Sequence, residues 1–227
     1  MKTFHFPWSI SCLLFFCTAA SYAQETKLIV NYFPRSKQVA ERYTVLKSNR
    51  TIKHGSYAAY FRMSKKDYEG FQMGVLKLED FVKIKGGYQL GKKGGEWEEY
   101  IQPQVLKSKG NYHGDKKIGV WFIAHEEAQV IERFDFDRQQ KLHPIFQIKV
   151  GYPENARKAG QTGTISLSFQ TYPDCTVSNI TLLQTASPAL DNAAMEWMKK
   201  YATYLKHYGV NCIEKIDTQV LVFNLEK

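Results

Sequence analysis

The sequence predicts a mostly β protein, in which a sheet of stacked β-hairpins is followed by a small domain with the element order α-β-β-α-β. Two observations lead to this fold class. In the first half of the 227 residues, a motif rich in glycine and aromatic residues recurs after 24 positions. From His143-Pro144 onward, alternating helix and strand patterns replace this motif. We therefore predict a repeat region at 24–137, a linker at 138–149 and an α+β domain at 150–227.

Residues 1–23 have the pattern of a cleavable signal peptide. Lys2 supplies the positive charge, an apolar run extends from Ile10 to Ala20, and a pair of small residues two positions apart ends at Ala23. The run is too short to cross a bilayer as a helix, which takes about 20 residues. This pattern predicts export, with cleavage near Ala23 and a location in the periplasm or at the outer membrane. A lipidated leader processed at Cys17 is the alternative.

The chain is basic, and its charge favours acidic partners. The net charge of +9 falls to +8 when the leader is removed with Lys2. Such a surface suits anionic lipids, lipopolysaccharide or acidic peptides. Nucleic acid is not expected, because an exported protein rarely meets it and the lysines are scattered rather than grouped in a short block.

The internal repeat aligns residues 86–97 with residues 110–121. The two copies share a glycine, a tyrosine, two lysines, a second glycine and a tryptophan at equivalent positions. In each copy the aromatic residues flank a turn rich in glycine and lysine, which predicts a β-hairpin. We expect the flanking aromatics to pack between hairpins, or alternatively to stack on a ligand. They are Tyr88, Trp97, Tyr112 and Trp121.

Weaker copies of the repeat lie at 53–57 and 68–71, and a half-copy lies at 131–136, so hairpins are expected from residue 26 onward. The pattern G-x-Y-x-x-G-K-K-x-G-x-W resembles the divergent bacterial form of the MORN repeat family over about residues 50–137. In that family the repeats form an elongated sheet that serves as a scaffold or as a binding surface, sometimes for lipids. The resemblance brings no catalytic residues with it.

The second half predicts a compact α/β unit. Proline at position 153 and glycine at 160 delimit a short helix, and Ser187-Pro188 begins a long one. Broken alternation near Asn179 indicates a β-bulge. The expected elements, in order, are a helix at 152–159, strands at 163–169 and 177–182, a helix from 188 onward and a final strand at 218–225.

An ordered set of short motifs in this unit resembles the C-terminal domain of TonB, the energy transducer of outer-membrane transport, over about residues 150–225. The motifs are Tyr152-Pro153-x-x-Ala156-Arg157, Gly160-x-x-Gly163-x-Ile165-x-Leu167-x-Phe169 and Leu190-Asp191-x-Ala193-Ala194. In the family, this domain binds the TonB-box peptide of a transporter as an added strand beside its last strand. TonB itself also has a permanent inner-membrane helix and a proline-rich spacer, neither of which this sequence predicts.

The resemblance implies a set of partner-binding residues in and near the last strand. Those of the strand are Val220, Leu221, Val222 and Phe223, and those near the peptide are Tyr152, Pro153 and Arg157. The alternative is that the same residues complete the core and the cap of the domain itself. The last strand also offers a surface through which two copies of the chain would form a homodimer.

Two cysteines, Cys175 and Cys212, remain after the leader. In an exported chain they predict one disulfide that closes a loop of about 37 residues, and two free thiols are the alternative. Cys175 stands at a turn position where the TonB family commonly has glycine. A bond to Cys212 would tie the loop before the last strand to that turn.

No pattern of catalytic, metal-binding or cofactor-binding residues appears. The histidines have no metal-ligand spacing, and neither a nucleophile elbow nor a phosphate-binding loop is present. We therefore predict a non-enzymatic envelope protein without a cofactor, which binds an extended peptide of an outer-membrane transporter or of another envelope protein. The alternative is an adhesive or structural protein whose repeat sheet binds lipid or glycan.

Overall fold

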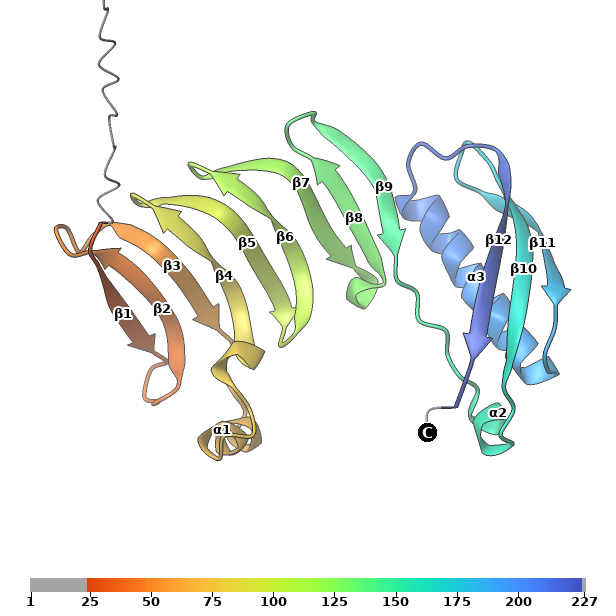
Figure 1. Cartoon of the computed structure of the whole chain (residues 1–227), viewed down its shortest axis with the longest axis horizontal. Coiled ribbons are helices and arrows are strands. Elements are labelled where there is room, and N and C mark those ends of the chain that lie inside the picture. Colours follow the sequence, from red (N-terminus) through yellow and green to blue (C-terminus); the bar gives the residue numbers. More distant parts are fainter. Residues whose placement is uncertain (1–23, 226–227) are drawn as a thin grey trace, which may run out of the picture.

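The computed structural model describes residues 24–225, so the predicted signal peptide lies outside the described residues. The chain forms a nine-stranded antiparallel sheet, in which every strand pairs with its neighbours in sequence, and then a three-stranded sheet covered by helices (Figure 1). This confirms the predicted fold class. None of the helices within the described range has the length and apolar character that a membrane span needs.

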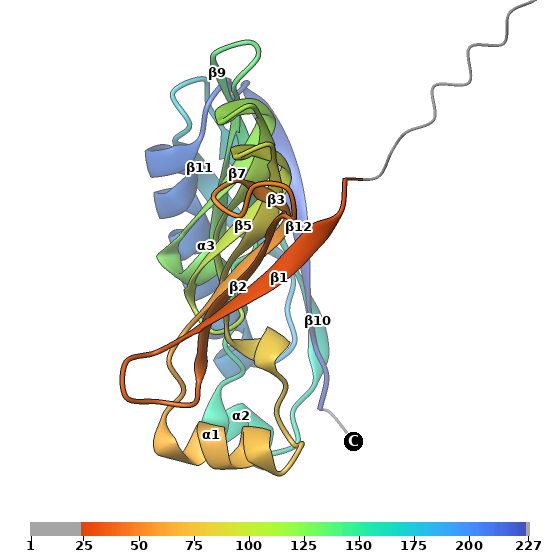
Figure 2. The same ribbon diagram turned by 90° about the vertical axis from the view of Figure 1, so that its left-hand side faces the viewer.

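The large sheet is a meander. Its strands are Thr26–Tyr32 (β1), Val39–Leu46 (β2), Lys53–Tyr60 (β3), Val82–Gln89 (β4), Lys92–Gln102 (β5), Val105–His113 (β6), Lys116–His125 (β7), Val130–Asp135 (β8) and Gln140–Phe146 (β9). The sheet twists along its length, so that β1 runs obliquely to the later strands (Figure 2). A short 3₁₀ turn, Glu126–Ala128 (η2), connects β7 to β8.

The repeated glycines and tryptophans pack against each other. A Cβ atom at Gly86 would lie 2.2 Å from the Trp97 ring, and one at Gly110 would lie 2.3 Å from the Trp121 ring. The Trp97 indole donates a hydrogen bond to the carbonyl of Gly87 at 3.1 Å, and the Trp121 indole makes the equivalent bond at the same length. Each tryptophan therefore covers a glycine on the preceding strand, which explains why both residue types recur together.

The segment between β3 and β4 departs from the hairpin pattern. It contains the helix Lys65–Gln72 (α1) and the 3₁₀ turn Leu78–Phe81 (η1), and α1 protrudes beyond the ends of the strands (Figures 1 and 2). The expectation of a weak hairpin copy at 68–71 is therefore wrong. The Ser64 hydroxyl caps the helix by accepting a hydrogen bond from the Asp67 amide at 3.2 Å, and this cap favours a helix at 65–72.

Strand β9 lies inside the segment that we predicted as a linker. Pro144 suggests a break from sequence alone, because proline cannot donate to a β ladder. It is tolerated here because β9 is the edge strand of the large sheet. The sheet therefore extends to Phe146, and the connection to the second part begins after it.

The second part follows the predicted order. A short helix, Glu154–Lys158 (α2), precedes the strands Gly163–Thr171 (β10) and Val177–Gln184 (β11), the helix Pro188–Tyr208 (α3) and the strand Lys215–Phe223 (β12). The sheet order is β11-β10-β12, and α3 covers one face of it (Figure 1). At the start of α3, the Ser187 hydroxyl accepts a hydrogen bond from the Leu190 amide, as expected for a helix cap. Asn179 has a positive φ where the register between β10 and β11 shifts, as expected for a β-bulge.

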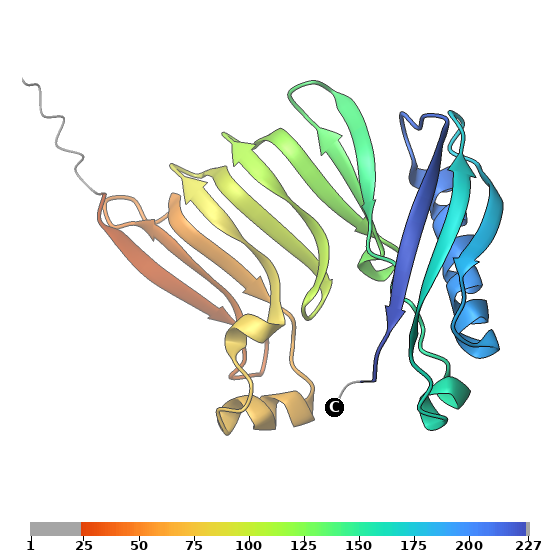
Figure 3. The ribbon, with the colours of Figure 1, turned by 45° about the vertical axis from the view of Figure 1, so that its right-hand side comes forward.

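The two parts touch through the β8–β9 end of the large sheet and α3. The Trp197 indole donates to the carbonyl of Ile148 at 2.9 Å, and the Phe146 and Tyr201 rings lie 5.3 Å apart. The His143 Nδ1 atom of β9 lies 3.0 Å from the carbonyl oxygen of Val210. These contacts join β9 and the chain after it to α3 and to the loop before β12, so the β9 edge of the large sheet faces the small domain (Figures 1 and 3).

Candidate functional site

The outer edge of β12 is free. On its inner side β12 pairs with β10 in an unbroken register from Gly163 opposite Phe223 to Thr171 opposite Lys215. On its outer side, no backbone group within residues 24–225 hydrogen-bonds to it. One side chain bonds to the strand's own backbone, since Gln219 Nε2 donates to the Val220 carbonyl at 3.1 Å. A long strand without bulges whose outer edge has no backbone partner is a template for the addition of another strand.

The four strand residues named from the sequence divide between two faces of the sheet. Leu221 and Phe223 are 6% and 3% exposed and belong to the core under α3. Val220 and Val222 point to the other face and are 52% and 61% exposed, as is Ile216 at 73%. Exposing a row of apolar side chains to water is unfavourable in free energy, so this row beside the outer edge of β12 is a candidate contact surface.

The three residues expected near a peptide gather at the Phe223 end of β12. The Tyr152 ring lies 5.5 Å from the Phe223 ring, in an edge-to-face arrangement. The Arg157 guanidinium lies 5.6 Å from the centre of the Tyr152 ring, and Pro153 is the residue that precedes α2. These contacts place an aromatic ring and a cation at the Phe223 end of β12, with Tyr152 packed against the core.

Cys175 and Cys212 form a disulfide, which confirms the prediction of one bond. The bond ties the loop between α3 and β12 to the β10–β11 turn. An ion pair between Lys206 and Asp174, with an N–O distance of 2.9 Å, lies beside the same turn. The disulfide and the ion pair therefore fasten the loop after α3 and the last turn of α3, respectively, to the β10–β11 turn.

The four repeat aromatics lie in one ladder across the large sheet. Trp97 contacts Tyr88 at 5.2 Å and Tyr112 at 5.9 Å between ring centres, and Tyr112 contacts Trp121 at 5.0 Å. Both tryptophans are buried, and burial raises the pKa values of the Tyr88 and Tyr112 hydroxyls. The ring faces are covered by neighbouring rings and by lysine side chains, with the Lys93 Nζ atom 4.5 Å from the centre of the Trp97 ring.

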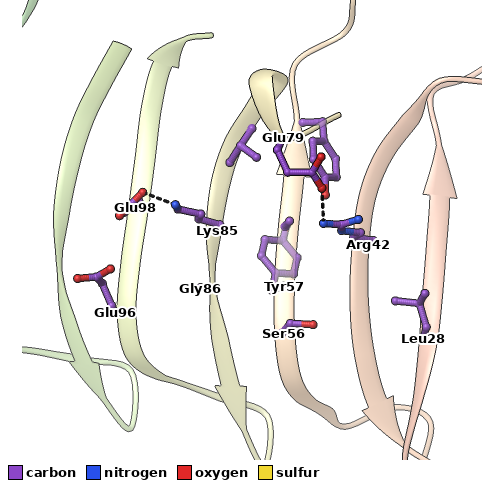
Figure 4. A pocket seen from close by; sticks show the side chains of 12 residues that line it. Leu28, Arg42, Ser56, Tyr57, Glu79, Lys85, Gly86, Glu96 and Glu98 are labelled. Carbon is purple, nitrogen blue, oxygen red and sulfur yellow. Dashed lines mark hydrogen bonds and ion pairs between the residues drawn. The ribbon is translucent and has the colours of Figure 1, made fainter. Parts of the chain in front are cut away.

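A groove on the large sheet was not expected from the sequence. It has a volume of about 550 Å³ and crosses β1 to β5, from Leu28 to Glu96 (Figure 4). Ion pairs line it, with N–O distances of 3.0 Å between Arg42 and Glu79 and 2.7 Å between Lys85 and Glu98. The groove forms where η1 approaches strands that are far from it in sequence, so no local sequence pattern predicts it.

Two polar groups of the groove differ in how well they are satisfied. Burial alone would raise the pKa of Glu98, but hydrogen bonds from Lys85, Tyr100 and Lys109 outweigh it and lower the pKa to about 2. The buried Tyr60 hydroxyl, in contrast, has no hydrogen-bond partner among the described residues. Within the same range, no cluster of three histidine, cysteine or acidic side chains could hold a metal ion.

Comparison with known proteins bears on the second part of the chain. Residues 149–221 match the family described as Gram-negative bacterial TonB protein C-terminal, which confirms the resemblance predicted for this domain. The NMR solution structure of the Helicobacter pylori TonB C-terminal domain is 22% identical, covers 34% of this chain and 71% of that chain, and has a TM-score of 0.31. No curated protein matches the chain. The matched range includes Val220 and Leu221 and ends before Val222.

Proposed function

We propose that this chain is a non-enzymatic envelope protein whose C-terminal domain binds an extended peptide along the outer edge of β12. The observation that carries the proposal is the free, bulge-free edge of β12 in a domain that matches the TonB C-terminal family. The predicted leader supports a location outside the cytoplasm. The partner we expect is therefore an outer-membrane transporter or another envelope protein.

The physical basis of the binding is strand addition. Backbone hydrogen bonds to the β12 edge supply affinity, each worth a net of about 0.5–1.5 kcal/mol. The exposed row of Ile216, Val220 and Val222 supplies contacts for alternate side chains of the guest. The nine-stranded sheet serves as the scaffold that carries this domain.

Calorimetric titration of the leaderless protein with a TonB-box peptide tests this proposal. Replacing Val222 with proline removes one backbone donor of β12 and should abolish binding, whereas Val222→Ala keeps the donor and should weaken it only slightly. A thermal melt of each variant checks that the domain remains folded. Absence of heat at high peptide concentration would overturn the proposal.

A second set of peptides probes the backbone bonds without altering the protein. N-methylation of one peptide amide at a time should weaken binding at every other position, because alternate amides of an added strand face β12. Uniform tolerance of N-methylation would show that the peptide binds in another way.

The groove of Figure 4 favours a second candidate, in which the repeat sheet itself binds a lipid or glycan. Its charged side chains pair within the chain, Arg42 with Glu79 and Lys85 with Glu98. Apolar surface for a lipid or glycan comes from Leu28, Ala58 and Val82. Ala58 lines the groove, and Ala58→Trp should fill it. Co-sedimentation with lipopolysaccharide or phospholipid vesicles that this substitution does not reduce would exclude the groove as the site.

Two copies of the chain could also pair through β12 to give the homodimer considered above. Sedimentation velocity distinguishes this arrangement, because a dimer through β12 should dissociate when the peptide is added. A dimer that persists with bound peptide would use another surface.

A further inference from the structure

A cavity of about 230 Å³ lies where the two parts of the chain meet, at the start of β12. Its walls come from β9, β10, α3, the loop that carries Cys212, and β12. Its lining runs from Thr171 of β10 past Asp217 of β12 to His143 of β9, so the cavity reaches from the small sheet to the edge of the large sheet. It owes its existence to the contact between the repeat sheet and the C-terminal domain.

One wall of this cavity carries a hydroxyl group without a partner. Thr171 lies at the end of β10 and is 4% exposed, and its Oγ1 atom has no hydrogen-bond partner among the described residues. A buried hydroxyl that makes no hydrogen bond destabilises the fold, and valine has the same shape without that cost. The hydroxyl therefore indicates a polar guest.

Besides the Lys215 ammonium, which is a donor, the cavity presents acceptor atoms on His143 and Asp217. A carbonyl oxygen only accepts, so the contact between His143 Nδ1 and the Val210 oxygen requires a hydrogen on Nδ1. In the neutral ring, Nε2 is then left as an acceptor. Asp217 adds a carboxylate, which pairs with Lys215 at an N–O distance of 3.0 Å while both side chains stay partly exposed.

From this arrangement we infer that the cavity receives a basic side chain, arginine or lysine, of the strand that pairs with β12. The N–H groups of the guest side chain would donate to Asp217, Thr171 and His143. Its positive charge and that of Lys215 would both interact with the Asp217 carboxylate. This inference rests on the proposed function, because the guest strand delivers the side chain. It adds a preference at one position of the peptide, next to the start of β12.

Matched peptides test the inference by calorimetry on the leaderless protein. Arginine, lysine, citrulline or alanine is placed at each position of the TonB-box peptide in turn. At one position, arginine or lysine should bind about tenfold more tightly than alanine, the size of one hydrogen bond to a charged group. Citrulline keeps the shape of arginine without its charge, and it should bind like alanine or only slightly better.

Two substitutions in the protein complete the test. Asp217→Asn and Thr171→Val should each reduce the preference for the basic peptide and leave the alanine peptide unchanged. If Thr171→Val weakens both peptides equally, Thr171 has only a structural role and the inference fails. A thermal melt in the absence of peptide should show Thr171→Val to be as stable as the original protein or more stable.

The outcomes separate this inference from the proposed function. If no position prefers a basic residue while Val222→Pro still abolishes binding, the cavity has no such role and strand addition stands. If none of the peptides binds, strand addition itself is wrong, and the inference falls with it.

Discussion

The packing of tryptophan on glycine makes the large sheet sensitive to a single methyl group. In Gly86→Ala, the new Cβ would lie 2.2 Å from the Trp97 ring, far inside van der Waals contact. The indole must move, which costs about 1–3 kcal/mol for an overpacked core. Moving it also breaks the bond to the Gly87 carbonyl, a loss of about 1 kcal/mol. We expect a total loss of about 2–4 kcal/mol in the free energy of unfolding.

Gly87→Ala is the matched control, because a Cβ atom there meets no atom closer than 3.6 Å. It should change the free energy of unfolding by less than about 1 kcal/mol. Urea unfolding followed by circular dichroism measures both variants without relying on the fluorescence of Trp97. The double variant Gly86→Ala with Trp97→Val should lose less than the sum of the single variants, since the two residues compete for the same space. Equal effects of Gly86→Ala and Gly87→Ala would refute this reasoning.

Three further predictions concern stability. The pKa of Glu98 lies below its unfolded value of 4.5, so this carboxylate stabilises the fold above pH 4.5, and the contribution disappears as pH falls toward 2. In urea titrations, Glu98→Gln should flatten the dependence of the free energy of unfolding on pH between pH 4.5 and 2. An unchanged dependence would contradict the lowered pKa of Glu98. Reduction of the Cys175–Cys212 bond should cost up to about 4 kcal/mol, measured by denaturation with and without reductant, and a negligible change would contradict the expected constraint on the unfolded chain. Trp197→Phe removes the bond to the Ile148 carbonyl and should cost about 1 kcal/mol, and faster amide exchange should appear where the two parts meet.

Much of the fold could be read from local patterns. The tryptophan and glycine repeat predicts hairpins because each pair meets across neighbouring strands, as the Trp97 and Gly86 contact illustrates. In the second part, the cap at Ser187 and the bulge at Asn179 also follow from short-range rules. The disulfide was predicted from the two cysteines that remain after the leader. The same rules identified the last strand, which begins three residues earlier than expected.

The features that the sequence did not predict depend on contacts between distant segments. Pro144 suggested a boundary, and only the edge position of β9 makes the strand compatible with it. The groove near Tyr60 forms because η1 approaches the sheet, and the cavity at Thr171 forms where β9 meets α3 and the loop before β12. The hydroxyls of Tyr60 and Thr171 lack a hydrogen-bond partner among the described residues. This cannot be predicted from the sequence, because it depends on which groups surround each hydroxyl after folding.

Residue-resolved amide hydrogen exchange tests strand addition most directly. With a TonB-box peptide bound, alternate amides of Lys215–Phe223, those that do not bond to β10, should become protected, and the amides of the β11 edge should not change. Peptide binding that leaves every β12 amide as exposed as before would contradict the proposal that the partner joins this edge.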